Sequence, residues 1–258
     1  MHRLAFPVIF LLPALSALAQ SPPPSNPFAV ALAQQAIAAL TSGGTLSDVT
    51  LNATVTSTVG SPYDTGTATF YVKGTTESRV DFSWSASGTR SDVRNIVTRT
   101  PGGAWETNGR TPTPFAPHNC WTDASWFFPT LSSLSQTANP NFVFSYVARE
   151  QHGGVDTQHI RVYQWSAQVA PSALLSTMDF YLDPVSALPI AIEFQSHPDD
   201  NMRSNLPLEI DFANYQLVNG FQVPFHFQKI FGGGVVLDVT VTAASFNTGL
   251  PDSLFTLQ

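Results

Sequence analysis

Cys120 lies in the segment whose side chains are most suited to covalent chemistry, His118-Asn119-Cys120-Trp121-Thr122-Asp123. A catalytic cysteine needs a histidine base within hydrogen-bond reach and usually a third group that orients the histidine. His118 and Asp123 are the nearest candidates in sequence. The tryptophans around Cys120 instead favour burial, and unpaired cysteines are among the most buried residues in proteins. We therefore predict a buried structural thiol and assign no catalytic residue.

Histidines and acids also occur together where a metal ion would find ligands. The run His197-Pro198-Asp199-Asp200-Asn201 offers nitrogen and oxygen donors but lacks the ordered spacing of a dedicated calcium loop. We interpret it as a polar loop between two strands. His152 and His159 lie on either side of a Gly-Gly turn, where they could face each other across a hairpin, and we interpret both as surface residues. The sequence contains no His-Glu-x-x-His and no Cys-x-x-Cys pattern, so we predict no metal site and no cofactor.

Five acidic residues lie in runs where polar and apolar residues alternate: Asp81, Asp179, Glu193, Glu209 and Asp211. The alternation predicts that they lie on the solvent faces of strands rather than in a glycosidase-type pair. The chain also lacks a Gly-x-Ser-x-Gly elbow. We therefore expect a protein that is not an enzyme. A secreted hydrolase that uses dispersed carboxylates or Cys120 is the least favoured alternative.

Charged residues are scarce, and their balance is acidic. They make up 11% of the 258 residues, whereas hydrophobic residues make up 43% and include 19 Phe, which is ample for a core. Eleven basic and 18 acidic residues give a net charge of −7. Nucleic acids and anionic membranes attract basic patches, so this balance argues against both as partners. A single cysteine cannot form an internal disulfide, so stability must come from burial.

The first 19 residues have the pattern of a signal peptide. A basic start precedes an apolar run, Leu4–Leu18, and small residues stand at Ala17 and Ala19. The run is shorter than the roughly 20 residues that cross a bilayer, and two prolines interrupt it. We predict a signal peptide at 1–19, a Ser/Pro-rich lead at 20–26 and one domain at 27–258. The mature protein is then periplasmic or secreted and has no transmembrane segment.

The remaining sequence predicts one helix followed by strands. Asn26 and Pro27 form a helix start, and the run Phe28–Leu40 is rich in helix formers. Beyond it, apolar and polar residues alternate with period two in many short runs, as in Val49–Val55 and Val80–Trp84. Turn pairs such as Asn219-Gly220 separate the runs. We predict an antiparallel sheet of about 11 strands, which must curl, close or split.

One stretch interrupts this pattern. The segment Thr111–Pro117 is rich in proline and predicts an irregular loop. After it, Trp126-Phe127-Phe128 stands in a stretch that we predict to form one or two short helices between about Thr122 and Thr137. Because an aromatic helical insert must bury its apolar face, the open side of a curved sheet is its natural place. We predict that it forms a lid there.

Four stretches resemble the periplasmic lipoprotein-carrier (LolA/LolB-like) superfamily, and specifically a secreted bacterial branch of it. They are the helix and first strand Phe28–Val55, the hairpin Phe180–Pro189 with its Asp-Pro and Leu-Pro pairs, the strand pair Val218–Lys229 and the tail Leu250–Phe255. The resemblance implies a mainly β (α+β) fold. Its curved antiparallel sheet is an incomplete barrel, with the helices on the concave side. It also implies an apolar cavity for lipid acyl chains.

The arginine that the carriers use has no assigned counterpart in this sequence. Arg79, Arg90 and Arg94 are the candidates.

The leading functional hypothesis is an exported binding protein that holds a lipid, an acyl chain or another hydrophobic ligand between sheet and helices. The aromatic residues expected to line this site are Trp126, Phe127, Phe128, Phe70 and Phe82. The alternative is a structural or protein-interaction module in which the same aromatics fill the core. A cavity well below the ~300 Å³ lower end of ligand pockets would favour that alternative.

Overall fold

The computed structural model describes residues 21–256, apart from 59–63, 87–89 and 100–101. The predicted signal peptide at 1–19 lies outside the described residues. Among the helices of the described part, none is long and apolar enough to cross a membrane.

The described strands form one antiparallel sheet of 13 strands, so the prediction of about 11 was slightly low. One reason is that the proline-rich loop contributes a two-residue strand. The strands are β1 (Asp48–Ser57), β2 (Asp64–Lys73), β3 (Glu77–Ala86), β4 (Arg90–Arg99), β5 (Gly102–Thr107), β6 (Thr113–Pro114), β7 (Phe142–His152), β8 (Val155–Gln164), β9 (Met178–Leu182), β10 (Pro189–Ser196), β11 (Leu206–Val218), β12 (Phe221–Phe231) and β13 (Gly234–Phe246).

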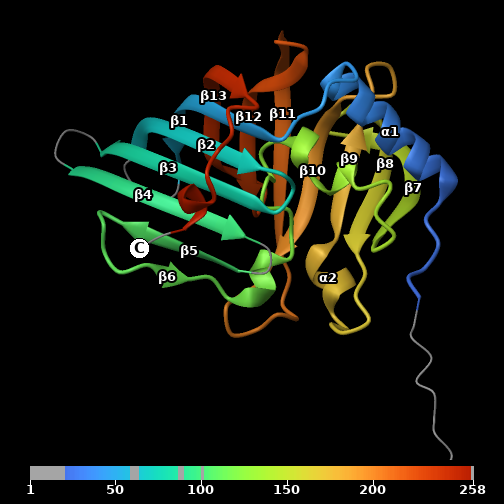
Figure 1. Ribbon diagram of the computed structural model, residues 1–258, viewed down its shortest axis with the longest axis horizontal. Coiled ribbons are helices and arrows are strands. Elements are labelled where there is room, and N and C mark those ends of the chain that lie inside the picture. The colour runs from blue at the N-terminus through green and yellow to red at the C-terminus, as the bar shows by residue number, and fades with distance from the viewer. Residues whose placement is uncertain (1–20, 59–63, 87–89, 100–101, 257–258) are drawn as a thin grey trace, which may run out of the picture.

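The sheet consists of two meanders joined at its centre. Its order is β6-β5-β4-β3-β2-β1-β13-β12-β11-β10-β9-β8-β7, so β1 pairs with β13 and the two edges are β6 and β7. Figure 1 shows the bending: β2 to β5 run across the view, whereas β8 to β11 run up and down. Among the described residues the two edges do not pair with each other, so the sheet is an incomplete barrel, as the family resemblance implied.

The inner face of the sheet carries the apolar residues of the alternating runs. Val49, Leu51, Ala53 and Val55 of β1 are all buried, and the other strands add large aromatics such as Phe70. The turns between strands follow the glycine signals: Asn219 and Gly220 both have positive φ, at 50° and 87°. Such a turn has the twist that suits a two-residue hairpin.

The first helix, α1 (Pro27–Thr41), begins where the sequence predicted. The side chain of Asn26 accepts hydrogen bonds from the backbone N–H groups of Phe28 and Ala29, at 2.9 and 3.1 Å. The helix buries mainly small side chains, among them Ala33 and Ala36, and these let it pack closely. It contacts β7, β8 and β12 and also the segment that crosses the sheet.

The chain must pass from the β6 edge to the β7 edge, and residues 115–141 make this passage. We call this stretch the crossover segment. Phe127, on the segment, packs against Phe70 of β2 at 4.8 Å between ring centroids, and its ring stacks with that of Phe227 of β12 at 6.4 Å. The crossover segment therefore covers the inner face at the centre of the sheet.

The crossover segment forms two short helices within the predicted stretch from about Thr122 to Thr137, and both are of the 3-10 kind: η2 (Pro129–Leu131) and η3 (Ser133–Ser135). A third 3-10 helix, η1 (Pro117–Cys120), precedes them. Pro129 lacks a backbone N–H, and the Ser132 hydroxyl donates to the carbonyl of Pro129 at 2.6 Å. Such local serine bonds compete with helical hydrogen bonding. Two further short elements are α2 (Ser172–Ser176) and η4 (Asp252–Phe255).

Candidate ligand-binding cavity

A cavity of about 530 Å³ lies between the inner face of the sheet and the crossover segment. Its apolar wall comes from β3, β10, β11 and β13, through Val80, Phe82, Trp84, Phe194, Leu208 and Leu237. The volume falls within the ~300–1,000 Å³ range of small-molecule pockets. The aromatic residues of this half of the sheet therefore leave a space rather than filling it, contrary to the alternative of a filled core.

The five aromatics expected to line a ligand site occupy two places. Phe82 and Trp126 line the cavity. Phe70, Phe127 and Phe128 are fully buried in the neighbouring core and do not line it. Contact between any of them and a ligand stays a prediction.

One wall of the cavity contains a cation. Lys229 of β12 lines it, and its Nζ lies 4.7 Å from the centroid of the Trp126 ring. Burial lowers the pKa of the Lys229 ammonium from 10.5 to about 8. Within the described part of the chain, no carboxylate forms an ion pair with Lys229. The cation therefore relies on the face of an aromatic ring, an attraction of about 0.5–2 kcal/mol.

Asp123 and His197 are further titratable groups that line the cavity. Asp123 accepts a hydrogen bond from the backbone N–H of Ser133 at 2.6 Å, and burial raises the pKa of its carboxyl to about 6. His197 is 3% exposed, and its Nδ1 lies 3.1 Å from the carbonyl oxygen of Ser204. Its Nε2 has no hydrogen-bond partner among the described residues. The cavity is thus apolar along one wall and polar where β10, β12 and the crossover segment meet.

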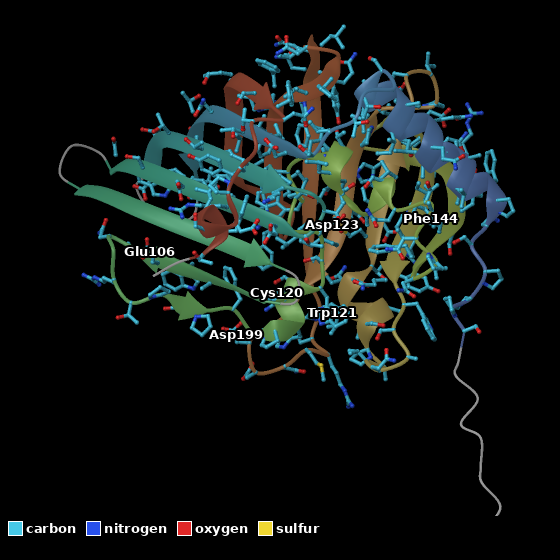
Figure 2. The ribbon with its side chains drawn as sticks, in the orientation of Figure 1. Glu106, Cys120, Trp121, Asp123, Phe144 and Asp199 are labelled. Atoms are coloured by element: carbon cyan, nitrogen blue, oxygen red, sulfur yellow. The ribbon has the colours of Figure 1, made fainter. Side chains whose placement is uncertain are left out.

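Cys120 is buried, as the sequence predicted. Burial raises the pKa of its thiol to about 11, so almost no thiolate exists at neutral pH. Among the described residues no hydrogen bond joins His118 to Cys120: the His118 Nε2 lies 3.0 Å from the carbonyl oxygen of Pro198, and the Cys120 thiol donates to the carbonyl of Ala116 at 3.9 Å. Figure 2 shows Cys120 and Asp123 on the crossover segment, near the middle of the molecule in this view. The geometry does not support thiol catalysis.

The histidines that we interpreted as surface residues are in fact part of a polar cluster on the outer face of the sheet. His159 is buried, with Nδ1 2.5 Å from Glu150 and Nε2 2.7 Å from Asp179. The pKa of His159 is raised: burial opposes the charged form, but the hydrogen bonds that the ring donates to the carboxylates of Asp179 and Glu150 outweigh that effect. His152 and His159 are not cross-strand partners, since His152 pairs with Val155. Both rings instead pack on Tyr181.

The group of described residues most suited to a metal ion lies in the same cluster. The ligand atoms of His152, Glu193 and Glu209 lie within 4.8 Å of one another. Sequence spacing could not reveal this group, because its members come from β7, β10 and β11. The His197–Asn201 loop is not part of it. Nearby, burial and the adjacent Glu209 raise the pKa of Asp211 to about 6.

Lys229 is the functional candidate that the sequence analysis missed. It belongs to an alternating row of β12 that is otherwise apolar: Val223, Phe225, Phe227, Lys229, Phe231. A lysine among these apolar residues could have indicated a charge on the inner face. Of the three arginine candidates, Arg79 bonds to Asp81 at 2.7 Å and to the carbonyl of Leu254 at 3.0 Å. The side chains of Arg90 and Arg94 lie outside the described residues.

Comparison with known proteins rests on structure. No family model and no curated protein matches this sequence. A LolA superfamily protein from Nitrosomonas europaea aligns with a TM-score of 0.56 at 12% identity, over 88% of this chain and 97% of its own. A DUF1329 family protein from Desulfovibrio piger aligns with a TM-score of 0.56 at 10% identity, over 90% of this chain and 98% of its own. A domain from Vibrio parahaemolyticus, provisionally named an outer membrane lipoprotein-sorting protein, aligns with a TM-score of 0.55 at 12% identity, over 88% of this chain and 95% of its own. This chain therefore has a LolA-like fold.

Proposed function

We propose that this protein is an exported, non-enzymatic carrier of a lipid or another hydrophobic ligand. The observation that carries the proposal is the 530 Å³ cavity between the curved sheet and the crossover segment. The signal-peptide pattern of residues 1–19 supports export to the periplasm or beyond. The LolA-like fold supports an acyl chain as the bound group, since the similar Vibrio domain is named for lipoprotein sorting.

A tryptophan placed in the cavity tests the proposal. Leu208 lines the cavity, whereas Leu217 lies on the same strand with 63% of its surface exposed. We expect Leu208→Trp to weaken uptake of a fluorescent fatty acid by delipidated protein at least tenfold. Leu217→Trp is the matched control and should bind like the wild type. Circular dichroism and thermal melts establish that both variants fold.

Mass spectrometry of the gently purified protein supplies an independent result. Under native conditions a retained mass that organic extraction identifies as lipid supports the carrier function. If no lipid copurifies and the delipidated wild type takes up no fatty acid, the proposal is wrong.

A further inference from the structure

Lys229 stands in apolar surroundings on the inner face. In register it lies opposite Ile210 of β11 on one side and Leu237 of β13 on the other. Both neighbours are buried. A cation in such a place is costly unless a counterion accompanies it, yet the Lys229 ammonium contacts the face of the Trp126 ring instead. The cavity thus holds a positive charge that the described residues leave without an anion.

The carboxyl groups of the cavity do not supply that anion. Asp123 already accepts the Ser133 N–H, and Asp199 is exposed on the loop that follows β10. Neither lies within ion-pair distance of Lys229. His197 offers a further unpartnered polar atom at the same cavity, its buried Nε2. These groups point to a ligand with a polar end as well as an apolar chain.

We infer that the cavity takes a single-chain amphipath with an anionic headgroup, whose charge pairs with the Lys229 ammonium while its chain lies along the wall of Phe82, Trp84 and Leu237. The inference rests on the proposed carrier function and specifies its ligand. A neutral ester would fill the same wall but leave the cation unpaired. The protein therefore distinguishes an acid from its ester by the charge at one end of the cavity.

The probes are laurate and methyl laurate, titrated calorimetrically into the delipidated full-length mature chain at pH 7. Laurate should bind at least tenfold more tightly than its ester. Lys229→Met should bind both with the affinity of the ester, and Lys229→Arg should restore the preference for laurate. Lys73→Met is the control, because Lys73 is the other lysine of the sequence and pairs with Asp252 at the surface. It should keep the wild-type preference.

A change of pH gives a second readout. The preference for laurate should decline between pH 7 and pH 9.5, as the Lys229 ammonium loses its proton. Asp123, Asp199 and His197 are the other titratable groups of the cavity, and at neutral pH and above none of them gains positive charge.

The outcomes separate the two proposals. Equal binding of laurate and methyl laurate by the wild type overturns the anionic-headgroup inference and leaves the carrier intact. A preference that persists in Lys229→Met overturns the inference as well. A wild type that binds neither probe contradicts the carrier function itself.

Discussion

Replacement of Lys229 by methionine should stabilise the ligand-free protein. Burial lowers the pKa of the ammonium from 10.5 to about 8. Each pKa unit corresponds to about 1.4 kcal/mol, so keeping the folded lysine charged at pH 7 costs about 3 kcal/mol. Methionine loses the attraction to the Trp126 ring, about 1 kcal/mol. The expected net gain is about 2 kcal/mol, or a Tm higher by about 4–8 °C.

The pH dependence of this gain distinguishes it from better packing. Between pH 8 and 10.5 the unfolded lysine keeps a proton that the folded lysine has released, so wild-type stability rises with pH in this window. The advantage of Lys229→Met should therefore shrink to less than half by pH 10. Urea denaturation of delipidated protein at pH 7 and pH 10 measures it, with Lys73→Met as a control that shows no comparable gain. A variant less stable than the wild type at pH 7, or an equal advantage at both pH values, refutes the reasoning.

Two further predictions concern the sheet and its cover. Asp48 is buried and accepts hydrogen bonds from the backbone N–H groups of Thr248 and Gly249, at 2.8 and 3.1 Å. Burial raises the pKa of its carboxyl, but these bonds outweigh that and lower it. Asp48→Asn should therefore lower the free energy of unfolding by about 2 kcal/mol at pH 7, and by progressively less below about pH 4. Chemical denaturation at several pH values measures this difference. A loss of stability that is the same at every pH contradicts the prediction. Phe127→Ala should lower the free energy of unfolding by about 3–5 kcal/mol in the same assay. A decrease below about 1 kcal/mol would mean that packing of the crossover segment does not stabilise the core.

The parts of the fold that follow from local chemistry were predicted from the sequence. The Asn26 cap and the alternation of β1 and β3 each depend on neighbouring residues, and both predictions are confirmed. The pairing of β1 with β13 joins residues such as Val49 and Phe246, and alternation alone carries no information about such distant partners. The short helices predicted between about Thr122 and Thr137 are confirmed by η2 and η3. Their 3-10 form was not predicted, because apolar spacing does not register how serines and prolines take up backbone hydrogen bonds.

The site was predicted only in outline. Aromatic residues at inward positions indicated an apolar interior, and two of the five named residues, Phe82 and Trp126, line the cavity. Large apolar side chains look alike in sequence whether they face a space or one another, so Phe70 could not be distinguished from Phe82. The role of Lys229 depends on Trp126, which lies about a hundred positions earlier, and on the absence of an acid nearby. Only the folded arrangement reveals both.

The central pairing of β1 with β13 has a consequence for how the protein is made. A ribosome produces β1 early, but the edge of β1 that receives β13 has no partner until residues 234–246 exist. During that interval the nascent chain presents an open strand edge, and such edges are templates for aggregation. A message cut short before β13 would leave that edge open permanently. Copies of this protein that end before β13 should therefore aggregate more readily than the complete chain, whether or not a ligand is present.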